Sequence, residues 1–208
     1  MTNSKRYKIG WANRVTLARL LLIAPFVVCL LNQNEPGTSY RLWALAIFAL
    51  MAVSDFLDGF LARRFQDESP LGAFLDPLAD KLLVTFALVI LSVMGVTDWS
   101  SQPPRSIHMP AWVVVAAIAK DLIVSCGFAV IYLSTNTVLI RPRRLGKWCT
   151  AVELVLVLAM LLWPVLPTML DRLPQALWMT TAALAALATI DYIRDGNQYI
   201  ITTLAARK

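Results

Sequence analysis

The sequence predicts an all-α integral membrane protein with six transmembrane helices and a short N-terminal interfacial amphipathic helix. Of its 208 residues, 58% are hydrophobic and 15% are charged, and the mean hydropathy is +0.64. The chain contains six apolar runs of the roughly 20 residues that cross the hydrocarbon core of a bilayer. Its basic residues gather in alternate connecting segments, which is typical of an inserted helical bundle.

The interfacial helix is predicted over residues 1–12, where Tyr7, Ile9 and Trp11 stand among the basic residues Lys5, Arg6 and Lys8. The six spans cover about residues 15–33, 41–62, 72–97, 110–134, 146–166 and 173–193. Prolines separate the later spans: Pro103, Pro104 and Pro110 follow the third, Pro164 and Pro167 end the fifth, and Pro174 opens the sixth. One bundle, a single domain over residues 1–208, accounts for the whole length.

The basic residues predict the orientation of the bundle. One set of connections carries Lys5, Arg6, Lys8, Arg14, Arg63, Arg64, Arg141, Arg143, Arg144, Lys147, Arg194, Arg207 and Lys208, whereas the other set carries Arg41, Arg105 and Arg172. By the positive-inside rule, both termini are expected on the cytoplasmic side of a bacterial-type inner or plasma membrane. Much of this charge is explained by topology and by contact with anionic lipids.

Four aspartates stand at the cytoplasmic ends of two apolar spans. Asp55 and Asp58 are three residues apart near the end of the second span, and Asp76 and Asp80 are four apart near the start of the third. Each pair therefore shares a helix face, and a short loop brings both helix ends to the same depth. Because unneutralised carboxylates are costly there, and because no Cys or His is offered, the pattern predicts Mg²⁺ or Mn²⁺, with enough ligands for two ions.

Small residues and one arginine stand between these carboxylates. Gly59, Ala62 and Gly72 remove bulk from the helix surfaces, although such spacing also serves ordinary helix packing. Arg63 supplies a forked cation that is suited to a phosphate. The combination indicates a metal site with room for a phosphorylated ligand.

The full pattern, D-x2-D-G-x2-A-R-x8-G-x3-D-x3-D over residues 55–80, resembles the signature of the CDP-alcohol phosphatidyltransferases at every fixed position. NRVTLAR at 13–19 is similar to the opening of the bacterial members, although Ala12 stands where a proline is usual. The resemblance extends in outline over the whole chain.

The resemblance implies an enzyme of phospholipid biosynthesis that transfers the phosphatidyl group of CDP-diacylglycerol to an alcohol and releases CMP. It implies metal binding by Asp55, Asp58, Asp76 and Asp80, with Asp80 also the catalytic general base. It implies a CDP pocket lined by Asp55, Gly59, Ala62, Arg63 and Gly72, and a homodimer.

The acceptor is predicted less directly. Arg141, Arg143, Arg144 and Lys147 stand at the entrance to the fifth span, where they suit an anionic acceptor or serve as a topology signal. Lys120 lies within the fourth span and requires an anion, either an acceptor phosphate or Glu153; the adjacent Asp121 is expected to point elsewhere. Related phosphatidylglycerophosphate synthases often have lysine and glutamine at the positions of Cys149 and Glu153.

Glycerol 3-phosphate is the first acceptor that we expect, which gives phosphatidylglycerophosphate. A cardiolipin synthase that uses phosphatidylglycerol is the alternative within the same family. Outside the enzymes, a small divalent-cation transporter also places carboxylates in a membrane, but it does not require Gly59, Ala62, Arg63 and Gly72 at these offsets. Nucleic acid is not an expected partner.

Overall fold

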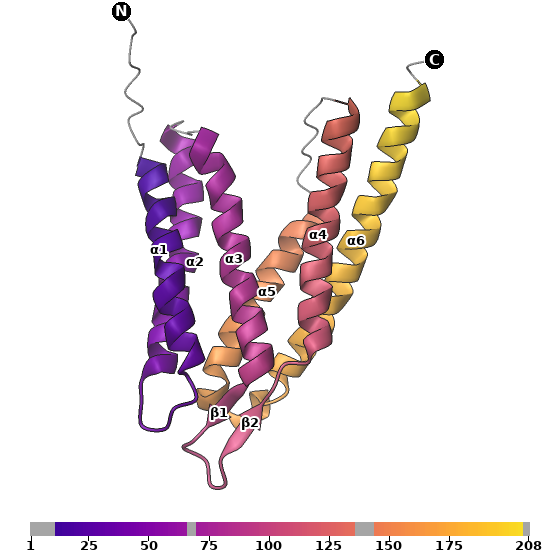
Figure 1. Cartoon of the computed structure of the whole chain (residues 1–208). Helices are drawn as coiled ribbons and strands as arrows, with labels where there is room; N and C mark the ends of the chain where they lie inside the picture. Colours follow the sequence, from indigo (N-terminus) through magenta and orange to yellow (C-terminus); the bar gives the residue numbers. More distant parts are fainter. Residues whose placement is uncertain (1–10, 66–69, 136–143, 206–208) are drawn as a thin grey trace, which may run out of the picture. The chain divides into compact units, whose positions relative to one another are not determined.

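The computed structural model is mostly helical (Figure 1) and describes residues 11–65, 70–135 and 144–205, with side chains for 17–54, 79, 81–127 and 145–196. The long helices are α1 (Trp11–Leu31), α2 (Tyr40–Phe65), α3 (Pro70–Met94), α4 (Ala111–Thr135), α5 (Arg144–Leu162) and α6 (Leu173–Ala205). Two short strands, β1 (Val96–Asp98) and β2 (Arg105–Ile107), follow α3, and two 3-10 turns, η1 (Trp163–Val165) and η2 (Thr168–Leu170), follow α5. The chain divides into two compact units, Met1–Ile90 and Leu91–Lys208.

In the first unit, α1 and α2 form an antiparallel pair joined by residues 32–39. Phe26 and Phe48 meet with ring centroids 5.7 Å apart, and Leu30, Ala44 and Met51 are buried beside them. Gly37 adopts a φ of +77°, a conformation that glycine allows at little cost in this connection. The pairing brings the beginning of α1 alongside the later half of α2.

In the second unit, α4 and α5 both pack against α6. Small residues allow close approach: Ala117 on α4 and Ala185 and Ala188 on α6 are buried. A Cβ at Gly146 of α5 would lie 3.3 Å from the Tyr192 hydroxyl of α6, so this position tolerates little added bulk.

Gly95 ends α3 earlier than the predicted span 72–97. Its φ is +64°, and a Cβ there would lie 2.7 Å from the Ile107 carbonyl oxygen, so only glycine fits without a shift of backbone. β1 and β2 then pair antiparallel, Val96 with Ile107; this short ribbon within the mostly helical fold was not predicted from the sequence. Ser92 donates a hydrogen bond to the Met109 carbonyl at 3.0 Å, which secures the return of the chain.

The other helices overlap the predicted spans but differ at their ends. α5 stops at Leu162 and passes into η1, which contains Pro164, while α6 continues twelve residues beyond the predicted end at 193. α1 already includes Trp11 and Ala12, and the rest of the predicted interfacial helix lies outside the described residues. Proline sets the start of α6 as predicted, with Pro174 in its first turn.

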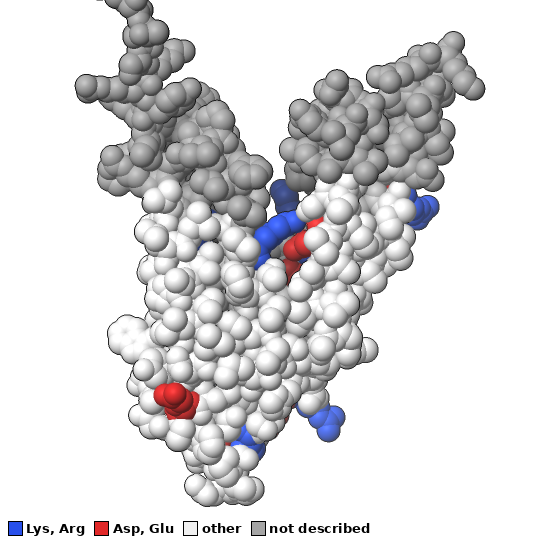
Figure 2. Space-filling model, viewed as in Figure 1, with Lys and Arg blue, Asp and Glu red and all other residues white. Residues whose placement is uncertain are grey.

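Two described segments are long and apolar enough to cross a membrane, Leu145–Val165 and Thr168–Gly196. Shorter apolar stretches occupy Leu17–Leu31, Tyr40–Ser54 and Lys81–Met94. Charged side chains are sparse over the described surface in the view of Figure 2. Large apolar side chains are exposed on several helices, among them Leu21 at 70% and Val93 at 75%.

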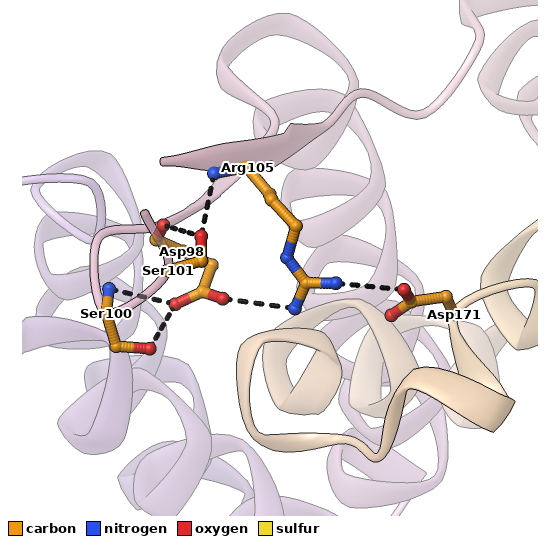
Figure 3. A network of polar contacts seen from close by, with 5 residues as sticks. All are labelled: Asp98, Ser100, Ser101, Arg105 and Asp171. Atoms are coloured by element: carbon orange, nitrogen blue, oxygen red, sulfur yellow. Dashed lines mark hydrogen bonds and ion pairs between the residues drawn. The ribbon is translucent and has the colours of Figure 1, made fainter. Parts of the chain in front are cut away.

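Arg105 ties three connecting segments of the second unit together (Figure 3). Its guanidinium donates to Asp98 Oδ2 at 3.2 Å and to Asp171 Oδ2 at 2.9 Å, and it lies 5.3 Å from the ring centroid of Trp163. Ser100 donates to the same Asp98 carboxylate from both its backbone N–H and its hydroxyl. The β ribbon is thereby joined to η1 and to the residue after η2.

Replacing Arg105 with Gln is expected to lower the free energy of unfolding by about 1–3 kcal/mol, because the buried Asp98 loses a charged donor. Denaturant unfolding in detergent measures the change. Arg172→Gln, on an exposed neighbour of Asp171, is the matched control and should stay within about 0.5 kcal/mol of the parent. Equal effects of the two changes would contradict the role of Arg105.

Acid is expected to loosen the same network. Hydrogen bonds from Ser100, together with the charge and hydrogen bond of Arg105, hold the pKa of Asp98 below its ordinary value of 3.8. The contribution of the Asp98 carboxylate to the free energy of unfolding is therefore complete above pH 3.8, its ordinary pKa, and is lost as pH falls through the lower folded-state pKa. Unfolding midpoints measured from about pH 6 to pH 2.5 should fall less steeply below about pH 4 in Asp98→Asn than in the parent; parallel curves would exclude this carboxylate as the cause.

Candidate functional site

The predicted metal ligands lie on the two helix ends that flank residues 66–69. Asp55 and Asp58 belong to about the last three turns of α2, and Asp76 and Asp80 to about the first three turns of α3. The helical spacing of each pair is thus confirmed, with each pair on one face of its helix. The carboxylates themselves lie outside the described side chains, so their convergence stays a prediction.

The residues predicted to line the nucleotide pocket belong to the same two helices. Gly59, Ala62 and Arg63 are on α2 and Gly72 is on α3, again with side chains outside the described set. Among the side chains that are described, no group of three or more His, Cys, Asp or Glu is arranged to hold a metal ion. The four aspartates remain the proposed metal ligands.

A cavity of about 170 Å³ lies between α1 and α2. Its lining is apolar at Ala18, Leu22, Leu50 and Met51 and polar at Arg19 and Ser54. Arg19 is 2% exposed, and Ser54 directly precedes Asp55 in the chain. Arg19 belongs to the NRVTLAR segment at 13–19, but the sequence predicted no function for it. The cavity that it lines forms only when α1 packs on α2.

A second buried polar cluster joins α4 to α5. Lys120 Nζ lies 2.9 Å from Glu153 Oε1 and 3.5 Å from Cys149 Sγ, and the Cys149 thiol lies 3.4 Å from the same Glu153 oxygen. The Lys120 and Glu153 side chains are each 4% exposed. Of the two partners considered for Lys120, the structure therefore supports Glu153.

One expectation about this cluster was wrong. Asp121 was expected to point away from Lys120, but its Oδ1 lies 3.4 Å from Lys120 Nζ. The Cys149 thiol contacts both Lys120 and Glu153. Lys120 thus already has contacts with two carboxylates and a thiol, which leaves an acceptor phosphate little of its hydrogen-bonding capacity.

The other predicted acceptor residues are placed only in part. Arg141 and Arg143 lie outside the described residues, and Arg144 begins α5 with its side chain outside them. Lys147 is exposed, one turn further along α5. Lys147 and Cys149 are neighbours on one helix, but only Cys149 joins the buried cluster.

The chain belongs to the CDP-alcohol phosphatidyltransferase family, whose model matches residues 10–194. That match covers all four aspartates, Arg19 and the buried cluster of α4 and α5.

Named relatives come from several bacteria. "CDP-diacylglycerol--glycerol-3-phosphate 3-phosphatidyltransferase" of Cereibacter sphaeroides is 34% identical over 150 residues, 71% of this chain and 62% of the relative. The protein of the same name from Bacillus subtilis is 32% identical over 159 residues, 72% and 75% of the two chains, and that from Pseudomonas fluorescens is 41% identical over 108 residues, 52% and 53%. The chain thus spans between about half and three quarters of these curated relatives.

The cluster of α4 and α5 predicts strong coupling between Lys120 and Glu153. Glu153→Ala leaves a buried ammonium without its closest partner, so the free energy of unfolding is expected to fall by about 3–5 kcal/mol. The double variant Lys120→Met, Glu153→Leu should recover most of that loss, because it removes both buried charges. Denaturant unfolding in detergent compares the double variant with its single variants Lys120→Met and Glu153→Leu, and the exposed Glu35→Ala is the control. A double variant whose loss of stability equals the sum of the two single losses would argue against the pair.

Proposed function

We propose that this protein is an integral membrane enzyme that transfers the phosphatidyl group of CDP-diacylglycerol to glycerol 3-phosphate and releases CMP. The observation that carries the proposal is the eight-residue signature where α2 ends and α3 begins, within a chain of the CDP-alcohol phosphatidyltransferase family. The relatives named above support glycerol 3-phosphate as acceptor, because each is named for that reaction.

Asp55, Asp58, Asp76 and Asp80 would hold two Mg²⁺ or Mn²⁺ ions. Their all-carboxylate chemistry and their helical spacing fit hard divalent cations. Bound there, such ions supply positive charge that offsets the charge of the diphosphate and of the leaving CMP.

The remaining residues of the signature position the donor and move one proton. Gly59, Ala62 and Gly72 would leave room for cytidine, and Arg63 would bind a diphosphate oxygen through its planar fork. Asp80 would accept the proton of the acceptor hydroxyl. The hydroxyl oxygen then forms a bond to the lipid-side phosphorus, and the bond from that phosphorus to the CMP oxygen breaks.

A bilayer location fits both the substrate and the surface of the protein. The acyl chains of the donor stay in hydrocarbon while its nucleotide meets water at the boundary. Six spans, with both termini and the signature on the cytoplasmic side, would agree with the exposed apolar side chains and with the basic connections. A homodimer is part of the same proposal.

The acceptor phosphate would be bound by Arg141, Arg143, Arg144 and Lys147 rather than by Lys120. The contacts of Lys120 with Glu153 and Asp121 give those three groups a net charge of −1, which disfavours a nearby dianion. Phosphatidylglycerol carries a single negative charge, so cardiolipin synthesis is the second candidate that this cluster favours.

A transfer assay tests the function. Purified protein with CDP-diacylglycerol and Mg²⁺ is supplied with either glycerol 3-phosphate or phosphatidylglycerol, and CMP and lipid products are measured. We expect CMP release with glycerol 3-phosphate, its loss on chelation, and a kcat at least about 100-fold lower in Asp80→Asn, because the proton acceptor is removed.

The control for this change is Glu35→Gln, an exposed carboxylate in the connection at the other end of α2, which should retain full activity. Nucleotide binding should persist in Asp80→Asn; a matching loss of binding would assign Asp80 to metal binding alone. Absence of CMP release with every alcohol tested would refute the enzymatic proposal.

A further inference from the structure

The cavity between α1 and α2 has both apolar and polar lining residues. This combination matches the part of a phospholipid where the acyl chains meet the phosphate. Of the six described residues that line it, four are apolar, and Arg19 and Ser54 are polar. A cavity of about 150 Å³ accommodates a benzene-sized group, so about 170 Å³ accepts a phosphate ester or the first carbons of an acyl chain.

Arg19 is the chemically informative member of this lining. Its side chain is almost wholly buried, and a buried guanidinium is stable only beside anions or strong hydrogen-bond acceptors. Arg19 has an interaction within the chain, and its guanidinium carries five N–H donors in a planar fork. It can therefore hold an internal partner and still donate to a phosphate oxygen.

The cavity reaches the apolar surface of the first unit. Ala18 and Leu50 are exposed although they line it, and Leu21 and Val53 beside them on the same helices are exposed as well. In a bilayer such a face contacts acyl chains. A ligand that enters here brings an apolar tail from the lipid side and meets Arg19 inside.

We propose that this cavity binds the diacylglycerol phosphate end of the CDP-diacylglycerol donor. Arg19 donates to an oxygen of the lipid-side phosphate, Ser54 donates to an ester oxygen, and Leu22 and Leu50 contact the start of an acyl chain. The placement of Ser54 directly before Asp55 sets this site next to the proposed metal ligands. The inference rests on the proposed function, to which it adds a lipid-specific half of the donor site.

The test separates the lipid half of the donor from its nucleotide half. KM for CDP-diacylglycerol is measured in mixed micelles, and the Kd for CDP, which lacks the lipid, is measured alongside. Arg19→Gln and Ala18→Phe should each raise KM roughly 10- to 100-fold, the effect of losing a charge-assisted hydrogen bond or of filling the cavity. The Kd for CDP and the KM for the acceptor should change less than about 2-fold, because neither touches this cavity.

Ala24→Phe is the matched control, since Ala24 is exposed on α1 and does not line the cavity; its kinetic constants should equal those of the parent. Arg19→Lys, which keeps the charge, should recover part of the affinity. If Arg19→Gln fails to fold, Ala18→Phe still decides the question. Unchanged KM in a folded Ala18→Phe protein, or an equal loss of CDP binding, overturns the inference while leaving the transferase function intact.

Phosphatidic acid distinguishes the lipid phosphate from the complete donor, because it has the diacylglycerol phosphate but no nucleotide. It should compete with CDP-diacylglycerol in the parent and compete at least roughly 10-fold more weakly in Ala18→Phe; failure to compete in the parent overturns the inference. If the parent releases no CMP at all, the transferase proposal fails. Equilibrium binding of labelled CDP-diacylglycerol to the parent and Ala18→Phe proteins then supports the lipid site when only the parent binds, and overturns it when both bind equally.

Discussion

The cost of placing charge inside an apolar helical protein is the constraint on which the rest of the structure depends. The charge of Lys120 is offset by contacts with two carboxylates and a thiol from α4 and α5. The charge of Arg105 is offset by ion pairs with Asp98 and Asp171. Each buried or half-buried charge thereby fixes a particular pair of segments, because moving either segment would leave a charge in low dielectric without its partner.

Much of the architecture follows from the sequence because apolar length and helix-breaking residues determine it. The apolar runs become α1 to α6, and Pro164 and Pro174 lie at the end of one helix and the start of another. The ribbon of β1 and β2 is different: its strands have three residues each, too few for a period of two to be recognised. Gly95 was the available signal, because a glycine that follows a long helix often adopts a left-handed conformation.

The candidate site also has a part that the sequence predicts and a part that it does not. Spacing alone predicts that Asp55 and Asp58 share one helix face and that Asp76 and Asp80 share another, and the helices α2 and α3 agree with that spacing. Contacts between helices could not be predicted from spacing. The proximity of Lys120 to Glu153 was one of two alternatives, and its contact with Asp121 was not expected. The cavity lined by Arg19 and Ser54 depends on how α1 packs against α2. The proposed metal ligands are thus recognisable from local sequence, whereas the buried cluster and the cavity depend on tertiary packing.

The Arg105 network has a consequence for the order of folding. Asp98 is seven residues from Arg105, whereas Asp171 is 66 residues away, and short loops close at a lower entropic cost than long ones. During synthesis from the N-terminus, the ribbon and its local ion pair can form before η2 exists. Arg105 is then already held in position when Asp171 emerges. The connection between α5 and α6 can therefore pair with a side chain that is already ordered.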